Sequence, residues 1–400
     1  MDESKSNHKV RNWFSAMLLL LPRVIPVYPF YLVPSFIAIK FTAVTVKRFF
    51  LFSFLLLVNF LISALFAPVS ITAFFLAYIL QLPFLFFIFG VPIKKDYEGI
   101  KILRILNVLT FLLSLANMTQ YGFPAKLPYR DFPPDYFSAL FGDGGAKMVT
   151  IIGFFGFISE IFTKKEKRNK TVLVISILNF LLPSYLIGII MGLGALLLVA
   201  MRRHVIIPFV VFMAGLIILP YALERLQALN SNFSQTVGYN PKVFAYISIF
   251  EVYDKYPNTF FTGTGLGQFT STPALWASKY MSSLSTHSIP NIPGLSMSGY
   301  HDKILGPILS TLSDNSWSLS SSANKPYTSL STVFNEYGLI VGIYVLILYI
   351  KAFNDLGFKK RYVSTIFFFA AFLYCTDLMH DNFWLGYLLL LSKDISLDIT

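Results

Sequence analysis

The sequence predicts an all-α protein that crosses a membrane many times, and three observations support this fold class. Apolar residues make up 55% of the 400 residues, and charged residues only 13%, about half their usual share in a soluble domain. The apolar residues occur in repeated long runs, as in a polytopic membrane protein. Lys and Arg form short clusters between these runs, a pattern typical of cytoplasmic loops. The composition therefore excludes a cytosolic enzyme, a disulfide-rich secreted domain and a disordered chain.

The basic clusters predict about twelve membrane spans with both termini in the cytoplasm. If every cluster is cytoplasmic, each interval between clusters must cross the membrane an even number of times. Several spans are shorter than the roughly 20 residues that a straight helix needs. Four prolines interrupt the first pair, which is either a proline-broken hairpin or one long tilted helix. The predicted spans are residues 13–22, 25–40, 49–66, 71–91, 100–118, 147–163, 171–183, 185–201, 204–220, 331–350, 362–379 and 382–392.

The spans divide the chain into N-terminal membrane helices (1–220), a large outer loop (221–330) and C-terminal membrane helices (331–400). A smaller outer loop is expected at 119–146. In the first half of the large loop the sequence predicts a helix over 241–256, because Pro241 suits the first position of a helix and Pro257 suits the position just after its end. The second half is rich in Ser, and its two histidines, His287 and His301, are expected to be solvated.

Charge and cysteine content indicate no further ligand class. The net charge of +12 is explained by the orientation of the protein in the membrane, so no nucleic-acid partner is expected. The single cysteine, Cys375, allows no intrachain disulfide and no cysteine metal cluster. The five histidines are scattered without metal-ligand spacing. The sequence therefore predicts neither a metal site nor a cofactor.

One stretch of the large loop carries a family resemblance. A helix with Lys242 and Tyr246 at its start is followed by Pro257 and the motif GTGLGQF at 263–269, and NEYGLIVG follows at 335–342. In this order the motifs resemble those of bacterial O-antigen and exopolysaccharide polymerases and of the related O-antigen ligases. Ligases typically carry a histidine just before the GLIVG-like helix, whereas KPYTSLST at 325–332 has none. The resemblance therefore favours a polymerase, although the family usually has Arg where this chain has Lys242.

The resemblance implies a GT-C-like membrane glycosyltransferase of the bacterial inner membrane, with the large loop in the periplasm. Such an enzyme transfers a glycan from undecaprenyl diphosphate to a sugar hydroxyl of a second lipid-linked unit, in O-antigen, capsule or exopolysaccharide synthesis. The expected mechanism is of the inverting type and metal-independent. The implied partners are lipid-linked oligosaccharides, membrane lipids, a chain-length regulator and a flippase.

This chemistry requires cations for the diphosphate and a base for the acceptor hydroxyl. Arg225 is the only arginine of the large loop and follows a predicted span, where it could also serve as an interface anchor. Glu336 and Asp377 are carboxylates at membrane depth, which are functional candidates by default. The catalytic candidates are Arg225, Lys242, Glu336 and Asp377. The candidates for binding diphosphate or glycan are Arg130, Arg23, Tyr246, Gly263, Gly265 and Gly267.

Three other functions stay open at this point. An O-antigen ligase belongs to the same class of enzyme, and the missing histidine argues against it. A flippase or transporter of lipid-linked oligosaccharides also fits twelve spans, but the sequence has no visible internal repeat and has an outer loop of some 110 residues. A non-enzymatic membrane scaffold would leave the cationic pattern of the outer loops without a function.

Overall fold

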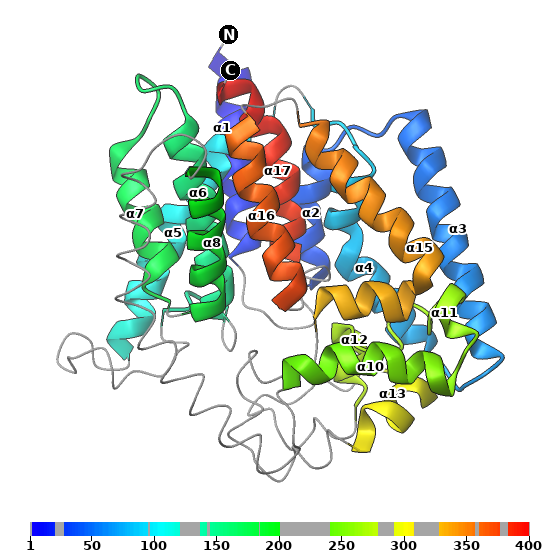
Figure 1. Ribbon diagram of the computed structural model, residues 1–400. Coiled ribbons are helices and arrows are strands. Elements are labelled where there is room, and N and C mark those ends of the chain that lie inside the picture. Colours follow the sequence, from blue (N-terminus) through cyan, green and yellow to red (C-terminus); the bar gives the residue numbers. More distant parts are fainter. Residues whose placement is uncertain are drawn as a thin grey trace.

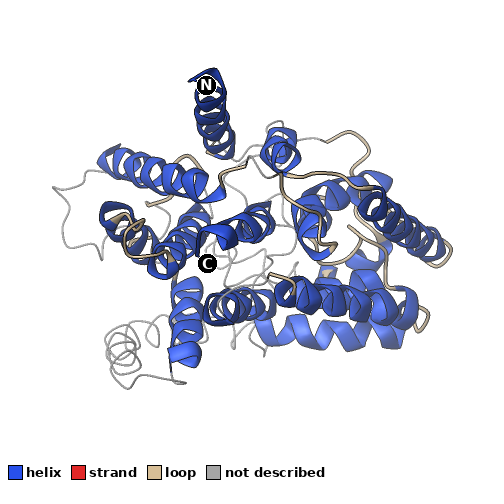
Figure 2. Ribbon diagram, turned by 90° about the horizontal axis from the view of Figure 1, so that it is seen from above, coloured by secondary structure: helices blue, strands red, loops and turns tan. Residues whose placement is uncertain are grey.

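The computed structural model is a bundle of helices with several shorter helices at one end (Figure 1). Figure 2 shows helices and loops but no strand among the described residues, where the one β-bridge joins Ile39 to Ile93. The structure describes residues 2–20, 28–94, 97–120, 137–141, 145–183, 185–200, 241–278, 292–307, 328–356, 360–376 and 383–399.

Five of the described helices are long and apolar enough to cross a membrane. They are α3 (Ala43–Ala64), α4 (Ile71–Ile88), α5 (Gly99–Gln120), α6 (Gly145–Phe162) and α15 (Ser329–Asn354). The other helices of the bundle are α1 (Asp2–Leu19), α2 (Tyr28–Ala38), α7 (Lys170–Leu181), α8 (Leu186–Ala200), α16 (Lys360–Thr376) and α17 (Phe383–Ile399). The described part of the chain is thus all-helical and has the long apolar helices expected of a membrane protein.

The helices follow the predicted spans. Each span overlaps one helix, except 204–220, which lies outside the described residues, but α1 begins well before span 13–22 and α17 ends well after span 382–392. The proline-containing region 13–40 forms two helices, α1 and α2. The outer loop at 119–146 is described only at its two ends.

Polar side chains fix the starts of several helices. Asn169 accepts a hydrogen bond from Val172 N at 3.1 Å before α7, and Thr328 accepts one from Ser331 N at 3.0 Å before α15. Thr42 forms a capping box with Thr45 before α3. These side chains occupy backbone donors that the first turn of a helix leaves free. The apolar runs therefore begin as helices at defined residues.

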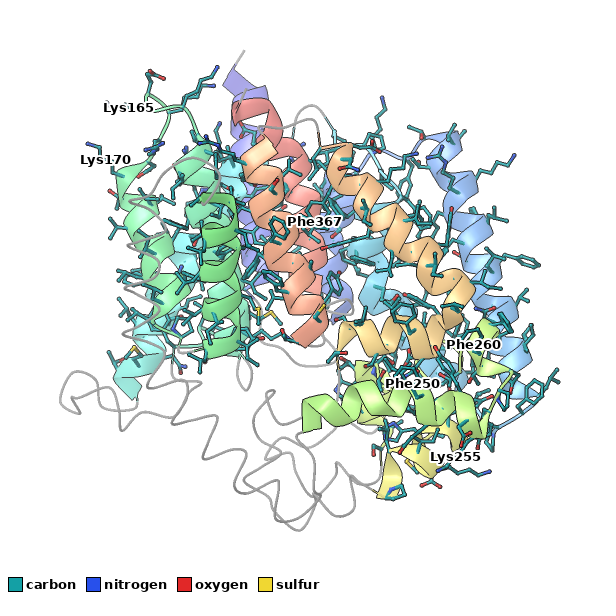
Figure 3. All side chains as sticks on the ribbon, in the orientation of Figure 1. Lys165, Lys170, Phe250, Lys255, Phe260 and Phe367 are labelled. Atoms are coloured by element: carbon teal, nitrogen blue, oxygen red, sulfur yellow. The ribbon has the colours of Figure 1, made fainter. Side chains whose placement is uncertain are left out.

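The described basic clusters lie at one end of the bundle, which we call the basic end. The ends of α2 and α4 meet there, with Lys40 N donating to Pro92 O at 2.7 Å and Lys94 N to Ala38 O at 2.9 Å. Figure 1 shows both termini at this end, and Figure 3 shows Lys165 and Lys170 there. The basic end includes Lys40, Lys94, Lys101, Arg104, Lys164, Lys165, Lys167, Lys170 and Lys393.

A buried ion pair joins α5 to α6 at the basic end. Arg104 Nη2 lies 3.0 Å from Glu160 Oε2 and donates to Lys167 O at 2.8 Å. Glu160 also accepts a hydrogen bond from Asn169 N at 2.9 Å. The carboxylate is buried, and breaking such a pair typically costs about 3–5 kcal/mol. The pair thus connects the basic α6–α7 loop to the bundle.

The bundle has a central and a peripheral part. Most residues of α6 are buried, and Phe154 of α6 stacks on Phe369 of α16 with ring centroids 3.8 Å apart. In contrast, only 22% of the α3 span is buried, and large apolar side chains such as Phe50, Phe54 and Leu61 are exposed on it. Such a helix suits contact with lipid.

The end opposite the basic end, which we call the loop end, contains four further helices among the described residues. They are α10 (Pro241–Lys255), α11 (Thr259–Thr262), α12 (Thr272–Trp276) and α13 (Gly299–Ile304). Figure 1 shows α10 lying across the direction of the bundle, beside the first part of α15. The helix α15 is broken at Gly338, where φ is 72° and ψ is 171°.

Candidate functional site

The GTGLGQF motif forms a turn that only glycine fits easily. We call residues 263–271 the glycine turn. Gly263, Gly265 and Gly267 have φ angles of 74°, 87° and 80°, in the region that side-chain-bearing residues rarely adopt. A Cβ on Gly263 would lie 2.3 Å from Glu336 O, and one on Gly267 would lie 2.3 Å from Ala73 O. The spacing G-x-G-x-G thus permits these backbone angles and allows the turn to lie close to the backbones of α15 and α4.

The glycine turn surrounds the carboxylate of Glu336. Glu336 Oε2 accepts a hydrogen bond from Gly267 N at 2.7 Å. Its Oε1 accepts three more, from Phe269 N, Thr270 N and Ser271 N, each at 2.9 Å. Glu336 is buried, so these charge-assisted bonds compensate for its desolvation. The two motifs of the sequence, GTGLGQF and NEYGLIVG, are therefore joined through one side chain.

Gln268 joins the glycine turn to the connection between α3 and α4. Its Oε1 accepts from Ser70 N at 2.7 Å, and its Nε2 donates to Ser70 O at 2.9 Å. One amide side chain thus pairs with both backbone groups of Ser70. The last turn of α3 adds another bond, from Ser63 Oγ to Gly263 O at 3.0 Å. The glycine turn is consequently held between α4, α3 and α15.

The break in α15 leaves carbonyl groups without their helical partners, and neighbouring elements supply donors. Phe334 O accepts from Tyr253 Oη at 3.0 Å, and Asn335 O accepts from Thr264 N at 2.7 Å. Tyr337 O accepts from Asn59 Nδ2 at 3.1 Å. In the interior of a membrane protein such donors are required, because no bulk water is present to replace them. The glycine turn, α10 and α3 thus stabilise the break.

His301 of α13 binds the backbone of the glycine turn. Its Nδ1 lies 2.7 Å from Phe269 O, and its ring is buried. Burial lowers the pKa of His301 to about 4. The ring is therefore neutral at neutral pH, and because Nδ1 donates to the carbonyl, Nε2 is an acceptor. The expectation that His301 is solvated was wrong, because the Ser-rich segment around it packs against the turn.

Several buried polar atoms around the glycine turn have no hydrogen-bond partner among the described residues. They belong to residues already bound to the turn through other atoms or to the turn itself. They are Thr264 Oγ1, Ser271 Oγ, His301 Nε2, and Nδ2 and Oδ1 of Asn335. Buried polar groups usually have a hydrogen-bond partner, either in the protein or in an ordered water molecule. These atoms give the turn hydrogen-bonding capacity beyond what its own fold uses.

The structure brings together four of the sequence-predicted site residues, namely Glu336 and the three glycines at 263, 265 and 267. Lys242 and Tyr246 lie on the first turns of α10, but their side chains lie outside the described part of the structure. Arg23, Arg130, Arg225 and Asp377 lie outside the described residues altogether. The helix expected over 241–256 corresponds to α10, and the chain from its end at Lys255 leads through α11 into the glycine turn.

Sequence reasoning missed three residues that shape the site, namely Asn59, Gln268 and His301. Asn59 is the one amide side chain in the apolar run 49–66, and such a side chain marks a residue that binds a buried partner. Gln268 is part of the GTGLGQF motif, of which only the glycines were predicted to take part in the site. Across the described ranges, no three His, Cys, Asp or Glu residues form a group suited to a metal ion.

Comparison of the chain with protein-family models, with curated proteins and with solved structures finds no match.

Proposed function

We propose that this protein is a polymerase of lipid-linked oligosaccharide repeat units in the bacterial inner membrane. It would act on the periplasmic face in the synthesis of O-antigen, capsule or exopolysaccharide. The observation that carries this proposal is the meeting of the GTGLGQF turn with the Glu336–Gly338 segment. These motifs are 65 to 69 residues apart, and both carry the resemblance to polymerases. Their meeting at the loop end, away from the basic end, supports an active site on the periplasmic side.

In the proposed reaction, the oxygen of an acceptor sugar hydroxyl forms a bond to the anomeric carbon of the donor glycan. The bond between that carbon and the phosphate oxygen breaks, and undecaprenyl diphosphate leaves with the electron pair. The hydroxyl proton passes to a base. Cationic side chains stabilise the charge that develops on the leaving diphosphate, and we assign this role to Lys242 and Arg225, with Arg130 and Arg23 as further contacts.

We assign Glu336 a positioning role rather than the role of base. Both of its oxygens already accept backbone hydrogen bonds, and accepting a proton would require some of these bonds to break. Asp377, near the outer end of the predicted eleventh span, remains our candidate base. In this assignment Glu336 fixes the glycine turn, which follows α10 and α11 in the chain, and α10 carries Lys242 on its first turn.

The test is electrophoresis of surface glycan from a strain that lacks the gene and is complemented with variants. We expect the deletion to reduce a polymer ladder to core plus one repeat unit. Lys242→Ala and Arg225→Ala should abolish or strongly reduce the ladder while membrane expression is retained. Lys255→Ala is the matched control, because Lys255 is an exposed lysine at the other end of the same helix, and it should restore the ladder.

Other outcomes would contradict the proposal in distinct ways. Bare core, with polymer accumulating on undecaprenyl diphosphate, would indicate a ligase. Single lipid-linked units trapped on the cytoplasmic side would indicate a flippase. Full ladders in both Lys242→Ala and Arg225→Ala would exclude these residues from the site. An unchanged glycan profile in the deletion strain, in capsule and secreted polymer as well, would indicate a non-enzymatic role.

A further inference from the structure

An exposed aromatic surface runs along α10 and α11 at the loop end. We call Phe250, Tyr253, Phe260 and Phe261 the aromatic ridge. Phe250 is 71% exposed and Phe261 is 56% exposed. The rings of Tyr253 and Phe260 lie 5.2 Å apart, and those of Phe260 and Phe261 lie 4.8 Å apart. Exposed phenylalanines this close together mark a surface that binds an apolar partner.

The rest of α10 is suited to a different environment. Val252 and Ser248 are buried against the body of the protein, and Tyr256 packs edge-on against Tyr300 of α13 at 4.8 Å. Asp254 and Lys255 are exposed. Figure 3 shows Phe260 on the side of α10 that faces the bundle and Lys255 on the side that faces away. Lys255 therefore lies on a different side of α10 from Phe260.

The depth of the ridge follows from the helix α3. Its 22 residues rise about 33 Å at 1.5 Å per residue, close to the roughly 30 Å of a bilayer hydrocarbon core. Ser63 in the last turn of α3 bonds to Gly263, the residue that follows α11. A span of this length reaches the boundary between acyl chains and headgroups at Ser63. The α11 end of the ridge therefore lies at that boundary.

The ridge continues the lipid-facing surface of the bundle. Leu61 and Leu65, at the end of α3 and just after it, are 55% and 80% exposed. Ile340, just after the break in α15, is 63% exposed. The α11 backbone approaches this break closely, since a Cβ on Gly338 would lie 2.4 Å from Phe261 O. Apolar side chains thus extend from both membrane helices to the ridge.

We propose that α10 and α11 lie in the plane of the outer leaflet, with the aromatic ridge inserted at the boundary of headgroups and acyl chains. A lipid surface fits better than a glycan, because the ridge joins exposed Leu and Ile side chains. In addition, the rings of Phe260 and Phe261 stand at 88° to each other and offer no flat stacking platform. Interfacial helices that expose Phe and Leu side chains bind membranes in this way.

The position of α10 in the outer leaflet sets the depth of Lys242, and the role of that depth rests on the proposed function. Figure 1 shows α10 lying across the bundle, level with the lower end of α3. A helix held in the headgroup plane along its length keeps its first turn, with Lys242, at the same depth. The diphosphate of a lipid-linked glycan occupies that depth as well. The aromatic ridge would therefore act as a depth guide for the cation of the site.

The test is spin-label accessibility in a bilayer, which the single cysteine makes practicable. In a Cys375→Ser background, Phe250→Cys and Phe261→Cys carry the label, and Lys255→Cys is the matched control on the side of α10 that faces away from the bundle. The protein is reconstituted in vesicles of phosphatidylethanolamine and phosphatidylglycerol. We expect labels at 250 and 261 to collide several-fold more with oxygen than with a water-soluble nickel chelate, and the label at 255 to show the reverse.

Nickel-dominated collisions at 250 and 261 would overturn the proposal, because they would show a surface open to water and free for glycan. Low accessibility to both reagents would also overturn it, because another protein surface would then cover the ridge. The labels report depth whether or not the protein is an enzyme. Lipid-exposed labels together with normal polymer in Phe261→Glu would support the membrane contact and count against its role in the proposed reaction.

Discussion

At the scale of single residues, Glu336 determines how the glycine turn meets the broken helix. Four backbone donors converge on its carboxylate. Replacing the carboxylate by an amide keeps the volume but places an NH₂ group against at least one of these donors. A buried donor that loses its acceptor costs about 1–3 kcal/mol, and more where a charge took part.

Glu336→Gln is therefore expected to destabilise the folded state by about 3 kcal/mol. The measurement is the thermal unfolding midpoint of the purified protein in detergent. Glu251→Gln is the control, because Glu251 is only partly buried on α10, and it should change the midpoint little. An unchanged midpoint in Glu336→Gln, with polymer lost, would contradict the positioning role and favour Glu336 as the base.

His301 gives the stability of the loop end a pH dependence. Its pKa of about 4 in the folded state lies below the ordinary value of 6.5, because burial disfavours the charged ring. The unfolded chain therefore binds a proton first as the pH falls. The stabilisation is fully present above about pH 6.5 and is lost progressively between pH 6.5 and 4, by on the order of 3 kcal/mol in total.

The unfolding midpoint measured from pH 7.5 to 4.5 tests this expectation. In His301→Asn no group at this position titrates in that range, so the midpoint should fall less steeply than in the wild-type protein. The difference between the two curves isolates His301 from the carboxylates, which also affect acid stability. Parallel curves would show that His301 is not buried in the neutral form.

At the scale of elements, the glycine turn depends on space as well as on backbone angle. Gly267 and Gly90 have similar φ angles, 80° and 69°. A Cβ on Gly267 would lie 2.3 Å from Ala73 O, whereas a Cβ on Gly90 would meet nothing within 4 Å. Only the backbone strain, about 1–2 kcal/mol, applies to both positions.

Gly90→Ala is expected to cost about that strain alone, whereas Gly267→Ala should cost clearly more, because α4 and the turn must separate. The unfolding midpoints of the two variants in detergent provide the comparison. Product formation in cells should be lost in Gly267→Ala and retained in Gly90→Ala. Equal midpoints would show that the turn does not pack against α4 as described.

The elements also show what the sequence could and could not predict. Apolar runs predicted the positions of the bundle helices, because the bilayer and the core both select such runs. The glycines of GTGLGQF predicted a tight turn, and all three have positive φ. The break at Gly338 was not predicted, because 331–350 reads as one continuous span. It is stabilised by Asn59, Tyr253 and Thr264, whose proximity is a tertiary property.

At the scale of the whole molecule, the basic end and the glycine turn lie on opposite sides of the bundle. If the membrane lies between them, a cysteine at each end should be accessible from one side only. In the Cys375→Ser background, Lys165→Cys reports the basic end and Ser296→Cys the loop end, both at exposed positions. A membrane-impermeant maleimide should label position 296 in intact spheroplasts and position 165 only after lysis.

The lysed sample is the control for reactivity at both positions. Labelling of both cysteines in intact spheroplasts would contradict a membrane between the two ends. Labelling of position 165 alone would reverse the orientation and move the glycine turn to the cytoplasmic side. The proposed polymerase would then be excluded, because its acceptor and donor glycans are on the periplasmic side.

The bonds that join the α3–α4 hairpin to the glycine turn also set an order for biosynthesis. Ser63 and its partner Gly263 are 200 residues apart, and Ser70 and Gln268 are 198 apart. At about 5–20 residues per second, the ribosome needs about 10–40 s to synthesise the intervening chain. During this interval the hairpin has neither partner, and Glu336 follows later still. The loop end therefore cannot be completed before residue 336 has been synthesised, and truncation of the chain before that residue would leave it incomplete.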